Sequence, residues 1–271
     1  MIPVSVVIIT RNEEAIIGRC LETASLISND IVIVDNGSTD DTIAIARAFN
    51  CRVYHKAWDG YGANKNKGIA LAKHDWILSI DADEVADMQL VEQLHRLPLN
   101  NPNVVYDIAF RSYFGQKHIR YGTWGRDHHR RLFNRSRVRW SETEVHETLL
   151  LPAGVQTMKL AGHLHHYSVN NIEECRQKAV HYARLSAAKY ANQGKKAGFF
   201  KCRLSPVFGF VMSYILRLGF LDGLEGLDIA LTMYKNTRLK YQHLKLLESR
   251  KYLSSGKPPV AKKLAVEYRS F

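Results

Sequence analysis

Two aspartates, Asp81 and Asp83, follow directly after a short apolar run that ends at Ile80. Such a run predicts a buried strand of a parallel sheet, so both carboxylates should emerge at the edge of that sheet. Carboxylate oxygens are preferred ligands of Mg2+ and Mn2+, and a cation held there can neutralise a departing diphosphate. The spacing predicts a divalent-metal site. The alternative is an acidic helix start without a ligand.

Two more polar clusters follow apolar runs. The first, after residues 4–9, consists of Thr10, Arg11, Asn12 and Glu13, and the second begins at Asp35 after residues 31–34. The carboxylate of Asp35 can accept a hydrogen bond from a nucleotide base, and Gly37 lets backbone approach a ligand. Neither cluster has the glycine pattern of a dinucleotide fingerprint or a P-loop, so the sequence argues against those phosphate-binding sites.

The elements that position these clusters alternate between strand and helix. Apolar runs at 4–9, 31–34 and 76–80, with a shorter strand at 53–54, are separated by helical spacing at 13–26 and 39–49. This order predicts a doubly wound, mostly parallel α/β sheet whose ligands gather at the carboxyl ends of its strands. After a turn-rich break at 100–103, strands are expected at 106–113, 130–133 and 138–146. Helices are expected over 171–247, interrupted near Gly194 and Pro206, and a loosely ordered tail over 254–271.

Composition and charge limit the class of protein. The chain has 271 residues, 46% hydrophobic and 24% charged, with 17 glycines and 7 prolines, which excludes collagen and mainly disordered chains. Its formal charge is +12. Lys and Arg number 19 against 21 Asp and Glu over residues 1–174, but 19 against 5 over 175–271. The four cysteines show no zinc or disulfide spacing, which suits a reducing cytosol.

Two basic regions indicate anionic partners. Arginines are dense over 113–139, and Arg126, Arg130 and Arg131 are candidates for binding a phosphorylated or carboxylated acceptor. The alternative is a solvated loop that pairs with nearby glutamates. Farther along, residues 206–221 are apolar except for Arg217 and are flanked by lysines and arginines. They are too short to span a bilayer and suit an interfacial element at an anionic membrane, or else a core or dimer helix.

The stretches SVVIITRNEE, IVIVDNGSTDDT and GYGANKNKGIALAKHDWILSIDADE resemble the family-two inverting glycosyltransferases of GT-A fold. The resemblance implies a nucleotide-sugar-binding half over 1–100, an acceptor and catalytic-base region over 101–170, and a helical, basic, membrane-associating extension over 171–271. It implies Mg2+ or Mn2+ as cofactor. The implied nucleotide-binding residues are Thr10, Arg11, Asn12, Glu13, Asp35, Gly37, Lys65, Asn66, Asp81 and Ala82, and the implied metal ligands are Asp83, Asp81 and His166.

An inverting transfer requires a carboxylate that takes the proton of the acceptor hydroxyl. The segment ETEVHE at 142–147 offers three glutamates, and in an extended chain Glu142 and Glu144 lie on the face opposite Glu147. The resemblance of V-H-E to related enzymes makes Glu147 the first candidate for the general base, with Glu144 and Glu142 as alternatives.

Further motifs, including YFGQ, WGRD, HHYS and RLGFLDGLEG, resemble bacterial lipopolysaccharide inner-core β-1,4-glucosyltransferases. That resemblance implies UDP-glucose as donor, a lipid-linked inner-core heptose as acceptor, no nucleic acid, and a cytoplasmic enzyme at the inner membrane surface. An alternative is a sugar-nucleotide pyrophosphorylase, which would need a glycine-rich basic loop after the first strand. Another is a nucleic-acid-binding protein using the basic last third, which would leave Asp81 and Asp83 unexplained.

Overall fold

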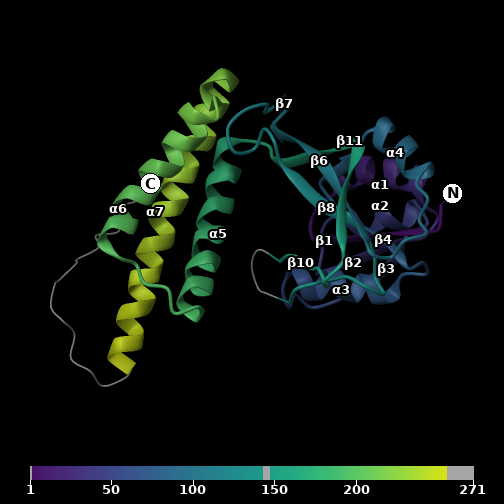
Figure 1. The fold of residues 1–271 in the computed structure, drawn as a ribbon, viewed down its shortest axis with the longest axis horizontal. Helices are drawn as coiled ribbons and strands as arrows, with labels where there is room; N and C mark the ends of the chain where they lie inside the picture. The colour runs from purple at the N-terminus through teal and green to yellow at the C-terminus, as the bar shows by residue number, and fades with distance from the viewer. Residues whose placement is uncertain (1, 143–146, 255–271) are drawn as a thin grey trace.

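The computed structural model describes residues 2–142 and 147–254, with side chains up to Ser249 (Figure 1). The strands are β1 (Val4–Thr10), β2 (Ile31–Asp35), β3 (Arg52–His55), β4 (Trp76–Asp81), β5 (Glu84–Ala86), β6 (Val104–Phe114), β7 (Lys117–His118), β8 (His128–Asn134), β9 (Arg139–Trp140), β10 (Leu149–Leu150) and β11 (Gln156–Val169). The α-helices are α1 (Ile17–Ile27), α2 (Thr42–Ala48), α3 (Tyr61–Leu71), α4 (Met88–His95), α5 (Ile172–Asn192), α6 (Phe199–Val211) and α7 (Gly223–Ser254). A short π-helix, η1 (Met212–Leu216), and a short 3-10 helix, η2 (Gly219–Asp222), connect α6 to α7.

One large sheet carries the first part of the chain, in the order β3-β2-β1-β4-β8-β6-β11-β5, with β7 paired to β6. Strands β3, β2, β1 and β4 are parallel neighbours, while β8 and β5 run antiparallel to the strands beside them. Thr10 pairs with Asp35 and Ile9 pairs with Asp81. The three polar clusters therefore begin side by side at the same edge of the sheet. The expected α/β sheet of GT-A type is confirmed, and its second half is mixed.

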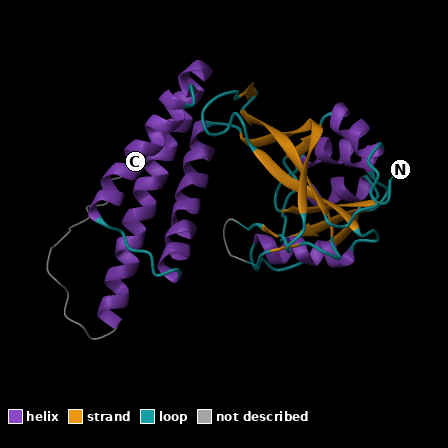
Figure 2. Cartoon of the chain, viewed as in Figure 1, coloured by secondary structure: helices purple, strands orange, loops and turns teal. Residues whose placement is uncertain are grey.

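The central strands β1, β2 and β4 are buried on both faces, as is typical of parallel strands. Alternate side chains of each strand enter two different cores because successive residues point to opposite faces. One core packs β1, β2 and β4 against α1, α2 and α4, and the other packs them against α3 and the β9–β10 hairpin (Figure 2). The largest fully buried side chains include Ile8, Ile33, Leu78, Leu21 and Leu90 on the first face and Ile77 and Phe133 on the second.

The helical extension, α5 to α7, forms a bundle beside the sheet (Figure 1). It is fastened to the turn after β7 by Asp222, whose buried carboxylate accepts hydrogen bonds from the backbone of Arg120 at 3.2 Å and Tyr121 at 2.8 Å. The Gly122 amide donates to the carbonyl of Arg217 at 2.9 Å. The extension therefore meets the sheet through specific backbone contacts.

Several element boundaries differ from the sequence expectation. Helix α1 begins at Ile17 rather than at residue 13, so Glu13 lies in the turn before the helix. The chain turns at Gly194 as expected, but α6 runs through the buried Pro206, which costs a helix one hydrogen bond without ending it. The 14-residue strand β11 was not predicted; it joins residues 156–169 to the same sheet as residues 4–81. The tail was expected to begin at residue 254, but Ser254 is the last residue of α7, and residues 255–271 lie outside the described part of the chain.

Replacing Gly68 by alanine tests how closely α3 approaches the sheet. A Cβ there would lie 2.5 Å from Val7 and 3.0 Å from Val34, and such overpacking should lower the free energy of unfolding by about 1–3 kcal/mol. Gly18 of α1 is the matched control, because its Cβ would meet Ile45 at an ordinary 3.9 Å. Gly18→Ala should raise stability by about 0.5–1 kcal/mol. Urea unfolding followed by circular dichroism measures both, and equal effects would contradict the close approach.

Candidate active site

A network of opposite charges lies at the carboxyl end of β4, where the half-buried Asp81 meets buried charged side chains. Asp81 is 3.1 Å from the Lys65 ammonium through one carboxylate oxygen and 3.1 Å from the Arg131 guanidinium through the other. Arg131 also pairs with the buried carboxylate of Glu84, and a second oxygen of Glu84 accepts from the Asp81 amide at 3.1 Å. Side chains from α3, β4, β5 and β8 are thereby held around Asp81.

These contacts shift the acidity of the carboxyl groups in opposite directions. Burial alone would raise the pKa of Asp81, but Lys65 and Arg131 outweigh it and hold that pKa well below its usual range. The pKa of Glu84 is raised to about 7, chiefly by burial. Arg131 opposes this shift, and the negative charge of Asp81 adds to it. Asp81 is therefore the firmly ionised member of the pair.

Asp83 lies beside His166 of β11, with 3.3 Å between a carboxylate oxygen and the imidazole Nε2. Burial disfavours the charged imidazole, but Asp83 outweighs burial and raises the pKa of His166 to about 9. The pKa of Asp83 is lowered in turn, because the charge and hydrogen bond of His166 exceed the effect of its burial. The pairing of β11 with β5, His166 opposite Glu84, places this histidine at the site.

The segment expected to carry the base also reaches this network. The carboxylate of Glu147 is 2.9 Å from the Lys65 ammonium, so one lysine contacts both Glu147 and Asp81. The same ammonium lies 4.7 Å from the centre of the Trp140 ring. Glu142 is exposed, and Glu144 lies outside the described residues. Close packing of Gly62 against the Ser141 carbonyl, where a Cβ would come within 1.9 Å, brings this segment onto α3.

The expected nucleotide-binding residues meet at the ends of β1 and β2. Asp35 is fully buried and accepts hydrogen bonds from the Gly37 amide at 3.0 Å, from the amide and hydroxyl of Ser38, and from His55. The Asn12 side chain accepts from the Thr39 amide at 2.8 Å and joins the two loops. Contact between Asp35 and a base stays a prediction, and it requires one of these partners to turn away.

Four other expected nucleotide contacts have different surroundings. The Asn66 amide donates to the carbonyl of Trp140 at 3.0 Å and accepts from its amide at 3.1 Å, so it holds β9 against α3. Thr10 and Ala82 are buried, whereas Arg11 is exposed. Buried Thr10 carries a hydroxyl without a hydrogen-bond partner among the described residues. A ligand that offers a polar group there would satisfy it.

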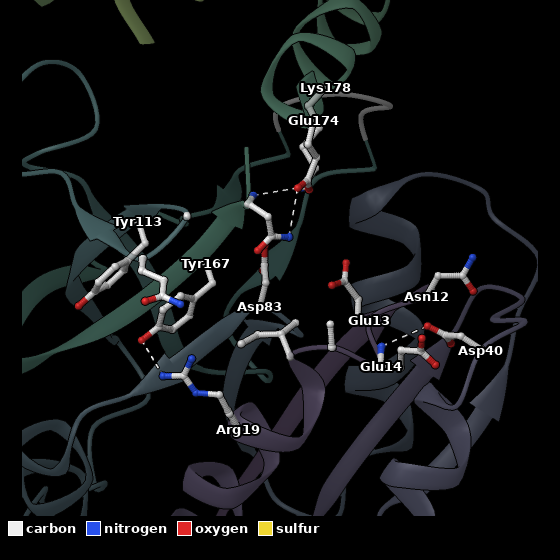
Figure 3. Close-up of a pocket in the computed structure, with 15 residues that line it drawn as sticks. Asn12, Glu13, Glu14, Arg19, Asp40, Asp83, Tyr113, Tyr167, Glu174 and Lys178 are labelled. Carbon is white, nitrogen blue, oxygen red and sulfur yellow. Dashed lines mark hydrogen bonds and ion pairs between the residues drawn. The ribbon is translucent and has the colours of Figure 1, made fainter. Parts of the chain in front are cut away.

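A pocket of about 870 Å3 adjoins Asp83 (Figure 3). Glu13 and Asp83 point into it, and burial together with the charge of Asp83 raises the pKa of Glu13 to about 7. Arg19 closes one side by donating a 2.8 Å hydrogen bond to the hydroxyl of Tyr167. Glu174 and Lys178 of α5 form another wall, so the helical extension contributes to this pocket.

The three candidate acceptor arginines do not share one surface. Arg131 is buried in the network around Asp81, because strand β8 pairs with β4 and turns it inward; it is not part of a solvated loop. Arg130 is exposed on the same strand and donates to the Thr157 hydroxyl at 3.2 Å. Arg126 is exposed in the turn before β8. Acceptor binding by Arg126, Arg130 and Arg131 stays a prediction.

Sequence reasoning missed several residues of this site. Glu84 carried a signal, since it follows Asp83 directly, and Tyr167 follows the histidine run. Arg19, Glu174 and Lys178 come from helices that only the fold brings to the pocket. Tyr113 stacks on Tyr167 with 4.6 Å between ring centres and completes the same wall. No periodicity in the sequence connects these positions.

The donor types near Asp83 fit a hard divalent cation. Asp81 and Asp83 supply carboxylate oxygens, and His166 supplies an imidazole nitrogen. Across residues 2–142 and 147–254, no three His, Cys, Asp or Glu side chains already converge in the geometry of a metal centre. The observed arrangement has Lys65 and Arg131 as the partners of Asp81.

Comparison with known proteins places this site in a family. The model of glycosyl transferase family 2 matches residues 5–156, which include the strand ends and Glu147. An uncharacterized glycosyltransferase of Rickettsia typhi is 28% identical over 82% of this chain and 80% of its own length. The lipopolysaccharide core biosynthesis glycosyltransferase LpsC of Rhizobium meliloti is 32% identical over 82% of this chain and 83% of its own.

A solved structure shows a weaker likeness. Glucosyl-3-phosphoglycerate synthase of Mycobacterium tuberculosis, crystallised with Mn2+, uridine diphosphate and glucosyl-3-phosphoglycerate, is 25% identical with a TM-score of 0.33. The likeness covers 42% of this chain and 44% of that one, and those ligands belong to that protein alone.

The family match, by contrast, spans more than half of this chain and supports neither the pyrophosphorylase nor the nucleic-acid-binding alternative. On that match and on the relationship to LpsC, the chain belongs to glycosyl transferase family 2 and is a glycosyltransferase.

Proposed function

We propose that this enzyme transfers glucose from UDP-glucose to an inner-core heptose of lipopolysaccharide, with inversion at the anomeric carbon. The observation that carries the proposal is the position of Lys65, which contacts Asp81 and Glu147 beside the Asp83–His166 pair and the large pocket. The shared contact with Lys65 supports Glu147 as a base close to Asp81, where the diphosphate would bind. The nature of the sugar and acceptor rests on the resemblance to inner-core glucosyltransferases and on the relative LpsC.

The nucleotide would bind across the ends of β1, β2 and β4, where Thr10, Asp35 and Asp81 lie at one level. The buried cations Lys65 and Arg131 provide positive charge next to that edge. Asp83 and His166, with Asp81, would hold Mg2+ or Mn2+. When bound, that cation neutralises charge on the diphosphate leaving group.

Glu147 would act as the general base. The acceptor oxygen attacks the anomeric carbon on the face opposite the diphosphate, and its proton passes to a carboxylate oxygen of Glu147. Lys65 holds that carboxylate at 2.9 Å, which limits the positions it can adopt. Positioning of the reacting groups is itself a large part of such catalysis, because it replaces an encounter in solution with a preformed geometry.

The acceptor would enter the pocket beside Asp83, whose volume of about 870 Å3 suits a saccharide portion of a larger molecule. The pocket includes α5 of the basic extension, so a lipid-linked acceptor would meet both parts of the enzyme. We place the enzyme in the cytoplasm, at the inner surface of the cytoplasmic membrane. The relative LpsC acts in lipopolysaccharide core biosynthesis by its name, which supports this location.

The two histidines His166 and His163 give a matched test of the metal site. Both lie on β11 beside an aspartate, His166 at 3.3 Å from Asp83 and His163 at 3.0 Å from Asp87, which caps α4. His166→Gln should raise the Mn2+ concentration needed for half-maximal transfer by at least about tenfold, because losing a ligand contact weakens metal binding. His163→Gln should leave it unchanged. The measurement is initial transfer rate against Mn2+ concentration at saturating UDP-glucose.

Asp83→Asn completes the same test. Removing a charged ligand should lower the transfer rate by about 100-fold or more, corresponding to several kcal/mol of transition-state stabilisation. Direct binding of Mn2+, followed by electron paramagnetic resonance with UDP present, should weaken in parallel. Full activity of the wild-type enzyme in excess chelator, or identical Mn2+ titrations for both histidine variants, would contradict the metal assignment.

Glu147→Gln tests the base. It keeps the shape of the side chain and removes the proton acceptor, so kcat should fall by about 100-fold to 10,000-fold. UDP-glucose affinity, measured by calorimetry, should change much less. Glu142→Gln, a glutamate exposed on the same segment, is the control and should retain near-normal kcat. If Glu142→Gln or Glu144→Gln caused the larger loss, the role would pass to that residue.

A further inference from the structure

We propose that an exposed apolar surface of the extension inserts into the interfacial layer of an anionic lipid bilayer without crossing it. The surface, called the apolar ridge here, lies on α6, η1, η2 and the start of α7. It consists of Phe199, Phe200, Leu204, Val207, Phe208, Ile215, Leu216, Leu218, Phe220, Leu221 and Leu224. The inference rests on the proposed function in one respect: the lipid surface is where a lipid-linked acceptor would be found.

The ridge is unusual in its exposure. Its side chains retain between 42% and 77% of their surface, Leu224 being the most exposed. Along α6, Phe200, Leu204, Val207 and Phe208 recur three and four residues apart and form one stripe of the helix. So many large apolar side chains left exposed on neighbouring elements of a folded chain indicate an interaction site, because leaving them in water costs free energy.

Charge identifies the occupant. Lys201 and Arg203 lie on either side of the α6 stripe by helical geometry, both are exposed, and Arg217 is exposed at the end of η1. Over residues 195–224 the sequence has five basic residues and one acid, Asp222. Asp222 is buried against the turn after β7. A second copy would bring more positive charge and no exposed acid from this segment, whereas an anionic lipid surface provides the complementary charge.

The packing of α6 against α7 limits how deeply the apolar ridge can enter a bilayer. The 18 residues Phe199–Leu216 are long and apolar enough to cross a membrane by length and composition, and only 11% of them are buried. However, α6 packs along α7: Cys202 adjoins the cluster of Tyr241 and Leu244, and Val207 adjoins Leu231. A crossing α6 would draw the intervening α7 charges, including Arg238 and Lys240, into hydrocarbon at high cost. An interfacial position keeps them in the headgroup region or in water.

Docking at this depth also bears on the active site. The end of the ridge is tied to the turn after β7 through Asp222 and through Arg217, whose carbonyl accepts from the Gly122 amide. Helix α5 of the same bundle contributes Glu174 and Lys178 to the pocket beside Asp83. A bilayer bound at the ridge would therefore have a fixed orientation relative to the pocket opening.

The test is co-sedimentation of the full chain with vesicles of phosphatidylcholine alone or mixed with phosphatidylglycerol, at low and high salt. The ridge variant carries Phe200→Gln, Leu204→Gln and Phe208→Gln, which keep good helix formers in α6. The control variant carries Met158→Gln and Leu150→Gln, two apolar side chains exposed on the sheet domain, at 51% and 45%. Retained thermal unfolding and UDP-glucose binding establish that each variant is folded.

The wild type and the control variant should bind the anionic vesicles alike, and high salt should weaken that binding because the charge attraction is screened over about 8 Å at physiological salt. The ridge variant should lose at least about tenfold in vesicle partitioning. Unchanged binding by the ridge variant, or equal wild-type binding to neutral vesicles, would overturn the proposal. So would a wild-type dimer in sedimentation velocity that the ridge variant breaks, since it would assign the ridge to a second copy.

Failure of the catalytic proposal would look different. Transfer to a soluble, delipidated acceptor should be the same for the wild type and the ridge variant, because no ridge residue lines the pocket beside Asp83. Vesicle binding without any transfer from UDP-glucose would refute the proposed activity and leave the docking surface standing. Transfer from UDP-glucose without vesicle binding would refute the docking surface and leave the proposed activity standing.

Discussion

The site depends on one buried ammonium group. Lys65 is 3% exposed at its side chain and is satisfied by Asp81 and Glu147, which come from β4 and from the segment after β9. Removing either partner from a buried charge is costly because the remaining charge has lost its compensation. The position of Lys65 in turn requires α3 to lie close to the sheet, and Gly68 permits that approach. Packing and electrostatics are thus coupled through a single helix.

The charges around Asp81 alternate in sign, and this organises the site before any ligand binds. Arg131 joins Asp81 to Glu84, while His166 joins Asp83 to β11. Burial raises the pKa of Glu84 to about 7. The pKa of His166 is raised to about 9, because the charge of Asp83 outweighs the effect of burial. Fixed charges of this kind need little rearrangement when substrate charge develops, which is the physical basis of electrostatic preorganisation.

The helical extension lines part of the pocket beside Asp83 and also forms a bundle of its own. Its helix α5 lines the pocket. Asp222, just before α7, accepts a hydrogen bond from the turn between β7 and β8, and β8 carries Arg131. The same bundle exposes the apolar ridge. The pocket beside Asp83, the apolar ridge and the charged network are therefore connected through short, hydrogen-bonded segments of chain.

The sequence by itself determined the α/β sheet, its parallel strands and the clusters at their carboxyl ends, because short apolar runs followed by polar residues are local signals. It also placed Glu147 and His166 among the candidates, through resemblance to known motifs. Only the tertiary structure decided that Arg131 turns inward, that α5 lines the pocket and that Lys65 bridges two carboxylates. The reason is physical: strand pairing and helix docking join residues separated by 50 to 82 positions along the chain, and no local pattern encodes those contacts.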